Sequence, residues 1–253
     1  MKLGTRSRVL LDVILTASID ALDFAAFPKR HLYDVGGWSD DRAARRRLRC
    51  MRDKGWIVWN EAESADDWVL KLTKEGRDVL REGVDPEDFW ARSWDGKWRL
   101  IAFDLPVERR KSRRELLAWL HSKRFGKLQE SLWVSPDFRD EWTKELELAS
   151  LDPREISFIE GHSFAGSDDL EFVKKAWRFG EINAGYRRLL DFHAKVPGKK
   201  SEGAIAAWIR AENAIWRDVF EKDPFLPDSL LPNGYLGKRA LAARKAAYSK
   251  ALS

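Results

Sequence analysis

Four arginines between residues 42 and 49 recur at intervals of three and four, so a helix would place them in one stripe. They are Arg42, Arg45, Arg46 and Arg49. Guanidinium groups neutralise phosphates, and their planar fork can pair with O6 and N7 of guanine. The spacing predicts a surface that binds nucleic acid. The alternative is a helix face that meets only water, which is common for basic runs.

This stripe falls on the third of three expected helices. Apolar residues at helical spacing predict the first over residues 5–19, and Pro28 suits the start of a short second helix. Ser39 is a favourable N-cap for the third, which closes at Gly55. Its packing face is expected to carry Ala44, Leu48 and Met51.

Two β-rich runs, Trp56–Trp59 and Trp68–Leu72, follow the third helix and predict a hairpin. Thr73 is expected to cap a further helix after the hairpin. Three helices, a hairpin and a helix form the order of a winged helix-turn-helix, whose third helix enters the major groove of DNA. The expected DNA-binding residues are Lys29, Arg30, Ser39, Arg42, Arg45, Arg46 and Arg49. The acidic turn of the hairpin should be repelled by phosphate.

Composition excludes several other kinds of chemistry. The chain has 253 residues, a formal net charge of +5, one cysteine and four scattered histidines. One cysteine cannot form an internal disulfide, and the closely spaced Cys and His pairs of a structural zinc site are absent. We expect Cys50 to be a small buried hydrophobe. No segment reaches the roughly 18 apolar residues of a membrane span. We therefore expect a cytoplasmic protein without catalytic site, metal, cofactor or membrane contact.

The middle of the chain predicts a small sheet. A buried strand is expected at Leu100–Phe103, and a helix with a basic start over 107–124. Further strands are expected after Gly126, at Ser131–Ser135 and at Ile156–Ile159, with a helix over 141–148 before the last one. The order β-α-β-β-α-β predicts a ferredoxin-like domain with two helices on one face of the sheet.

The remaining segment is expected to be all-helical, apart from a proline-rich loop over 223–237. Several aromatic and basic residues could line a pocket for an aromatic acyl group and its phosphates, or could instead form the core and a dimer interface. They are Trp177, Tyr186, Arg187, Arg188, Trp208, Arg210 and Trp216.

The central run from Trp98 to Pro136 resembles the signature of the PaaX family, the phenylacetic acid degradation repressors. It reads W-x-L-x-x-F-D-x-P, then R-x-x-R-R, then F-G-x-L-x-x-x-L-W-V-S-P. The ending Asp223-Pro224, with Leu226-Pro227 and Leu230-Leu231-Pro232 after it, is similar to that of the same family. The resemblance implies a homodimeric repressor that binds a double-stranded operator and is released by an acyl-CoA effector such as phenylacetyl-CoA. No residue identifies the effector.

With this resemblance, the sequence predicts an α+β protein of three domains. These are a winged helix-turn-helix over 1–92, a ferredoxin-like domain over 93–167 and an all-helical dimerisation and effector domain over 168–253. The basic start of the central helix has three interpretations: a solvated face, an extra DNA contact, or a dock for phosphates of a CoA-like ligand. The expected effector residues are Arg109, Arg110, Arg113, Arg187, Arg188 and Trp208.

Two alternative functions stay open at this stage. The central domain also resembles the small nuclease subunit of CRISPR spacer acquisition, which carries an acidic residue where Asp104 stands here. Such a carboxylate could hold a metal that activates water, but the sequence offers no second carboxylate with a matching role, and Asp104 could equally cap a helix or pair with arginine. The third hypothesis is a DNA-binding protein without sequence preference.

Overall fold

The structure is a computed structural model that describes residues 25–28, 41–60, 67–81, 85–137, 142, 145, 155–163, 168–196 and 202–252. The chain forms two compact units. Unit 1 comprises Met1–Asp85, Asn183–Glu221 and Leu236–Ser253, and unit 2 comprises Pro86–Ile182 and Lys222–Tyr235. Each unit therefore combines segments that are distant in the sequence.

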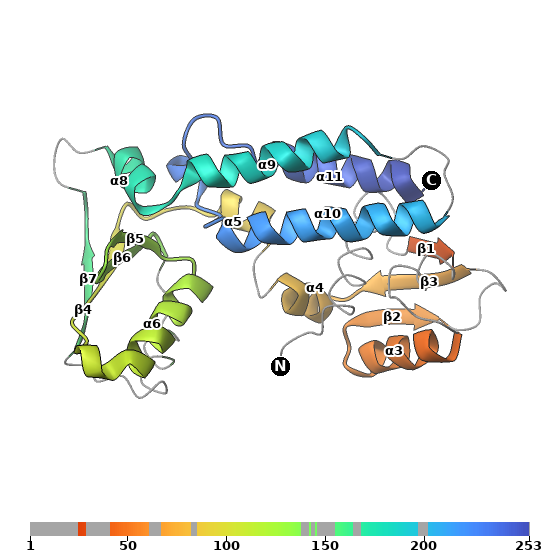
Figure 1. The fold of residues 1–253 in the computed structure, drawn as a ribbon, viewed down its shortest axis with the longest axis horizontal. Helices are drawn as coiled ribbons and strands as arrows, with labels where there is room; N and C mark the ends of the chain where they lie inside the picture. Colours follow the sequence, from red (N-terminus) through yellow and green to blue (C-terminus); the bar gives the residue numbers. More distant parts are fainter. Residues whose placement is uncertain are drawn as a thin grey trace. The chain divides into compact units, whose positions relative to one another are not determined.

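The three-stranded sheet of unit 1 contains the expected hairpin and one strand that was not predicted. β2 (Ile57–Asn60) and β3 (Asp67–Leu72) pair antiparallel, and β1 (Ala25–Pro28) lies on the other side of β3 (Figure 1). Pro28 thus closes an edge strand rather than opening a helix. Proline suits both places because neither needs its missing N–H. The helix expected over 5–19, and the rest of the second one, lie outside the described residues.

The third helix is present as predicted. α3 (Asp41–Asp53) buries its expected packing face, with Ala44, Leu48 and Met51 all nearly inaccessible to solvent. The chain then turns at Gly55, whose φ of +69° favours glycine. α4 (Lys74–Arg81) begins where Thr73 predicts, because Thr73 Oγ1 accepts a hydrogen bond of 2.9 Å from the N–H of Gly76. The same hydroxyl donates to the carbonyl oxygen of Gly55, so it joins the end of α3 to the start of α4.

Gly76 sits where helix and sheet approach too closely for a side chain. A Cβ at this position would lie 2.0 Å from the carbonyl oxygen of Trp56. Gly76→Ala is therefore expected to destabilise the protein by about 1–3 kcal/mol, because backbone would have to move. Gly180→Ala is the matched control, since its Cβ meets nothing within 4 Å and alanine favours a helix. Urea unfolding of both variants measures the difference. Equal stability would show that the contact at Gly76 is not tight in solution.

Unit 2 is built around a four-stranded antiparallel sheet of order β5-β6-β4-β7. Its strands are β4 (Trp98–Phe103), β5 (Gly126–Gln129), β6 (Leu132–Ser135) and β7 (Ile156–Gly161). Its helices are α5 (Pro86–Ala91), η1 (Val107–Arg109), α6 (Arg110–Ser122) and α8 (Asp169–Ala176). Trp142 and Glu145 are also helical. This order confirms the predicted central sheet region.

The core of unit 2 lies between the sheet and α6, which covers one of its faces (Figure 1). Ile101 and Phe103 project from β4 onto Leu116 and Leu120 of α6. Trp133, Trp142 and Phe125 complete the same cluster. Ile101 and Phe103 lie two residues apart, so the two-residue period of a strand places both on the face that α6 covers.

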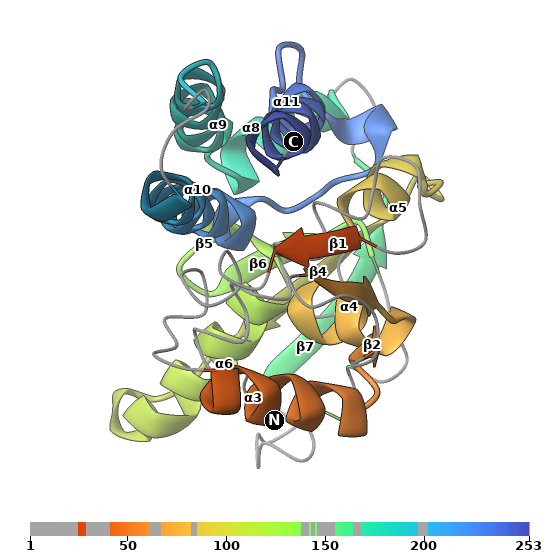
Figure 2. The same cartoon turned by 90° about the vertical axis from the view of Figure 1, so that its right-hand side faces the viewer.

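Three long helices run through unit 1, as Figure 2 shows nearly end-on. They are α9 (Phe179–His193), α10 (Glu202–Lys222) and α11 (Gly237–Leu252). The predicted proline-rich loop joins the last two and contains the short helix η2 (Asp228–Leu230). No described residue from Asp168 onward lies in a strand, which confirms a helical C-terminal region. Within the described residues, no helix combines the length and the apolar character needed to cross a membrane.

Candidate nucleic-acid interface and polar clusters

The exposed side of α3 forms a basic hollow. Arg42, Arg46 and Arg49 are exposed, and together with Cys50, Asp53 and Lys54 they line an open depression. Four of these side chains are cations and one is an anion. At about 100° per residue, the arginines point away from the buried face of the same helix. The hollow is therefore suited to an anionic partner.

Arg45 and Cys50 depart from the expected pattern. Arg45 is half-buried and does not line the hollow, because it is turned about 60° from Arg42 toward the side of the helix away from Arg46. Cys50 is also half-buried, so the expectation of a buried core position is wrong. It lies about 80° from Arg42 on the hollow side of the helix. Lys29, Arg30 and Ser39 lie outside the described residues.

The basic start of α6 is partly neutralised within unit 2. Arg109 Nη1 donates to Glu155 Oε2 over 2.7 Å, and Arg113 lies 3.8 Å from a carboxylate oxygen of Glu130. Arg110 is exposed. Arg187 and Arg188 are exposed in unit 1, where Arg188 lies 3.1 Å from Asp218. The six residues expected at the effector site are therefore divided between the units. Arg109, Arg110 and Arg113 belong to unit 2, and Arg187, Arg188 and Trp208 belong to unit 1.

Asp104 stands exposed at the end of β4, beside a carboxylate that the sequence did not reveal. Pairing of Phe103 with Ile156 brings Glu155 next to it, and the N–H of Asp104 donates to the carbonyl oxygen of Glu155 over 3.1 Å. The Glu155 side chain is held by Arg109. In the part of the chain that the structure describes, no three His, Cys, Asp or Glu side chains gather to hold a metal.

A buried polar network joins the three helices of unit 1, and it too was missed. Glu212 of α10 is fully buried and its two oxygens accept from four donors. His193 of α9 and Arg244 Nε of α11 bond to Oε1 over 3.0 and 2.9 Å. Arg244 Nη2 and the Tyr248 hydroxyl donate to Oε2 over 3.0 and 2.7 Å. Asn213 Nδ2 donates to the Tyr248 hydroxyl over 2.8 Å.

The charge of Glu212 is stabilised by this network despite its burial. Burial alone would raise the pKa of the carboxyl, but the charge of Arg244 and the hydrogen bonds from His193, Arg244 and Tyr248 outweigh it and lower the pKa to about 2. Aromatic rings surround the pair, with the Arg244 guanidinium 4.6 Å from the centre of the Trp216 ring. Trp208, expected at an effector site, is buried here and stacks on Phe192.

Comparison with known proteins gives the family. A sequence profile described as "PaaX protein central Cas2-like domain" matches residues 91–173, and one described as "PaaX-like protein C-terminal domain" matches residues 177–252. The chain belongs to the PaaX family. The two matches cover both the central sheet of unit 2 and the helices α9 to α11, and they confirm the resemblance carried by the Trp98–Pro136 signature.

Among solved structures, the PaaX-family chain is similar to an uncharacterized protein from Mycobacterium tuberculosis. The TM-score is 0.59 at 20% sequence identity, and the similarity covers 98% of this chain and 97% of that one. At this identity the comparison shows a shared fold alone. A search of curated proteins gave no match.

Proposed function

We propose that this PaaX-family protein is a transcription regulator that binds operator DNA through α3. The observation that carries the proposal is the hollow lined by Arg42, Arg46, Arg49 and Lys54, opposite a fully packed helix face. The three-stranded sheet and α4 around it fit a winged helix-turn-helix, with β2 and β3 as the wing. Arginines at this spacing can reach phosphates and base edges along one groove.

The remaining features of the proposal come from the family. A dimeric repressor in the cytoplasm, released by an acyl-CoA effector, is what the PaaX signature implies. A twofold dimer would match a palindromic operator. The central sheet of unit 2 is interpreted as ferredoxin-like, because its antiparallel strands have the order β5-β6-β4-β7, with α6 between β4 and β5 and the helical residues Trp142 and Glu145 between β6 and β7. The candidate contacts for effector phosphates are Arg109, Arg110, Arg113, Arg187 and Arg188, with Trp208 for an aromatic group.

Selection from a random double-stranded DNA library tests this function. The full-length protein is expected to enrich one palindromic sequence, and to bind it about 1,000-fold or more tightly than unrelated DNA at physiological salt. Phenylacetyl-CoA, added to the complex, serves as the first effector probe. Binding that falls steeply with salt but enriches no sequence would indicate a nonspecific DNA-binding protein. Absence of DNA binding would overturn the proposal.

A further inference from the structure

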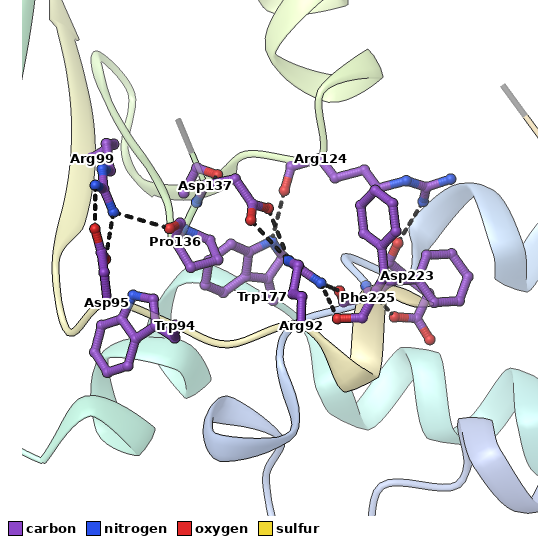
Figure 3. A network of polar contacts seen from close by, with 12 residues as sticks. Arg92, Trp94, Asp95, Arg99, Arg124, Pro136, Asp137, Trp177, Asp223 and Phe225 are labelled. Atoms are coloured by element: carbon purple, nitrogen blue, oxygen red, sulfur yellow. Dashed lines mark hydrogen bonds and ion pairs between the residues drawn. The ribbon is translucent and has the colours of Figure 1, made fainter. Parts of the chain in front are cut away.

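Residues 222–235, named the strap here, connect two helices of one unit but pack in the other. α10 and α11 run through unit 1, whereas Lys222–Tyr235 belongs to unit 2. The strap is therefore covalently continuous with unit 1 at both ends and is held by side chains of unit 2 along its length. Two arginines of unit 2, Arg92 and Arg124, anchor it (Figure 3).

The first anchor is Arg92, which follows α5. Its Nε and Nη2 bind the two carboxylate oxygens of Asp137, each over 2.8 Å, in a fork that fixes the guanidinium plane. Nη1 then donates to the carbonyl oxygen of Phe225 over 2.6 Å and also to that of Phe89. Arg92 thus ties the end of α5, the end of β6 and the strap together.

The second anchor is Arg124, which precedes β5. Its Nη1 donates to the carbonyl oxygen of Asp223, and its guanidinium lies 4.9 Å from the centre of the Phe225 ring (Figure 3). Arg124 and Phe225 both have positive φ, +62° and +46°, which is unfavourable for residues other than glycine. Such conformations persist where the surrounding contacts determine them more than the local backbone does. Tertiary contacts therefore hold both Arg124 and Phe225 in these backbone conformations.

The buried carboxylate of Asp223 joins the beginning of the strap to its end. Asp223 is fully buried, and its Oδ1 accepts from the N–H of Phe225 over 2.7 Å while its Oδ2 accepts from the Tyr235 hydroxyl over 2.5 Å. Trp90 packs against Phe225 and Tyr235, with ring centres 6.0 Å apart in both pairs. Asp223 and Tyr235, at opposite ends of the strap, are thereby joined to each other, and Trp90 of α5 packs against Tyr235.

The chain passes between the two units at four places, and a residue near each of them belongs to one group of unit 2 side chains. This group, named the strap cluster here, consists of Trp90, Arg92, Phe179, Asp223, Phe225 and Tyr235. The passages follow Asp85, Ile182, Glu221 and Tyr235. Trp90 and Arg92 come soon after the first, Phe179 shortly before the second, Asp223 just after the third, and Tyr235 at the fourth. Phe179 packs on Tyr235 with ring centres 5.9 Å apart, so residues beside every passage meet in one cluster of unit 2.

We propose that the strap cluster is the relay through which unit 2 controls unit 1. While these contacts are made, the strap that follows α10 and precedes α11 is held by Arg92 and Arg124 of unit 2. A change in unit 2 that loosens Arg92 or Arg124 would free both helix ends, and these helices belong to the same unit as α3. Coupling of this kind requires an element that both sides bias. The strap is connected to both sides, because its ends continue into helices of unit 1 and its backbone accepts hydrogen bonds from Arg92 and Arg124 of unit 2.

Hydrogen exchange of the full-length protein tests the relay without DNA. Arg92→Gln is expected to raise exchange roughly tenfold or more in residues 222–235, in the last turn of α10 and in the first turn of α11, with β4 and β6 unchanged. Tyr235→Phe removes one hydroxyl and should produce a smaller increase in the same peptides. Arg114→Gln, an exposed position on α6, is the control and should change neither. An increase confined to the strap, spread through β4 and β6, or absent in both variants would overturn the relay.

DNA binding provides a second readout, which rests on the proposed function. Arg92→Gln is expected to change operator affinity by roughly fivefold or more, although no residue of α3 is altered. Unchanged affinity together with freed helix ends would overturn control of DNA binding by the strap. If the unaltered protein binds no DNA, the proposed function fails, and hydrogen exchange still decides whether the strap couples the helix ends to the sheet.

Discussion

Replacing Arg42 and Arg46 together by alanine is expected to weaken operator binding by about 100-fold or more, with the melting temperature unchanged. Each arginine contact to a base edge or phosphate contributes about 1–3 kcal/mol, and both side chains are exposed, so the fold does not depend on them. For each lost phosphate contact, the slope of log affinity against log salt should also fall by about 1. Fluorescence anisotropy with labelled operator at several salt concentrations measures both quantities.

Arg52→Ala is the matched control for this experiment. Arg52 is exposed on the same helix but does not line the hollow, and it lies 3.7 Å from the carboxylate of Asp53. Its replacement removes one positive charge, so binding should weaken only slightly, through the general electrostatic attraction. If the double variant binds as tightly as the unaltered protein, α3 is not the recognition helix. If Arg52→Ala weakens binding equally, net charge and not the hollow determines affinity.

Glu212→Gln is expected to lower the free energy of unfolding by about 3–5 kcal/mol at pH 7. The change keeps the shape of the side chain but leaves the Arg244 charge buried without its counter-ion, which is the costly way to break a buried pair. Asp218→Asn on the same helix is the control, because its pair with Arg188 is exposed and such pairs contribute about 0–1 kcal/mol. Urea unfolding monitored by circular dichroism gives the comparison. A loss of the same small size in both variants would show that the network contributes little.

The contribution of Glu212 should also depend on pH in a defined direction. Its pKa is about 2 in the folded protein against an ordinary value of 4.5, so the folded state favours the ionised form. The resulting stability, about 3 kcal/mol, is present above pH 4.5 and is lost as the pH falls toward 2. The difference in unfolding free energy between the unaltered protein and Glu212→Gln should therefore shrink between pH 5 and pH 3. A constant difference would contradict the assigned pKa.

Local patterns in the sequence were sufficient where neighbours along the chain determine the structure. The i, i+4, i+7 spacing of Ala44, Leu48 and Met51 placed them in the core, and Thr73 caps its helix as predicted. The contacts that were missed join residues far apart in the sequence. A single sequence carries no record of such pairs, so these contacts could not be predicted from it. Glu212 did leave a signal, because it lies four residues from both Trp208 and Trp216, on the apolar face of α10. A charge in that position indicates a buried partner.

The candidate DNA interface was predictable only in part. Helical spacing identified Arg42, Arg46 and Arg49, but Arg45 and Cys50 lie at intermediate angles where small rotations decide burial. The strand β1 was missed because Pro28 suits an edge strand as well as a helix start. Glu155 came beside Asp104 through strand register, which the sequence does not specify across such a distance.

The interleaved segments of the two units also limit how the protein can mature and be dissected. On the ribosome, unit 2 lacks the partners of Arg92 and Trp90 until residue 235 has emerged, and Glu212 of unit 1 lacks Arg244 until residue 244 has emerged. A fragment that stops after α9 would leave the aromatic rings of Trp90 and Phe179 without Tyr235. Neither unit can therefore be obtained by a single cut of the chain, and recombinant fragments should join the strap to the central sheet through a designed linker.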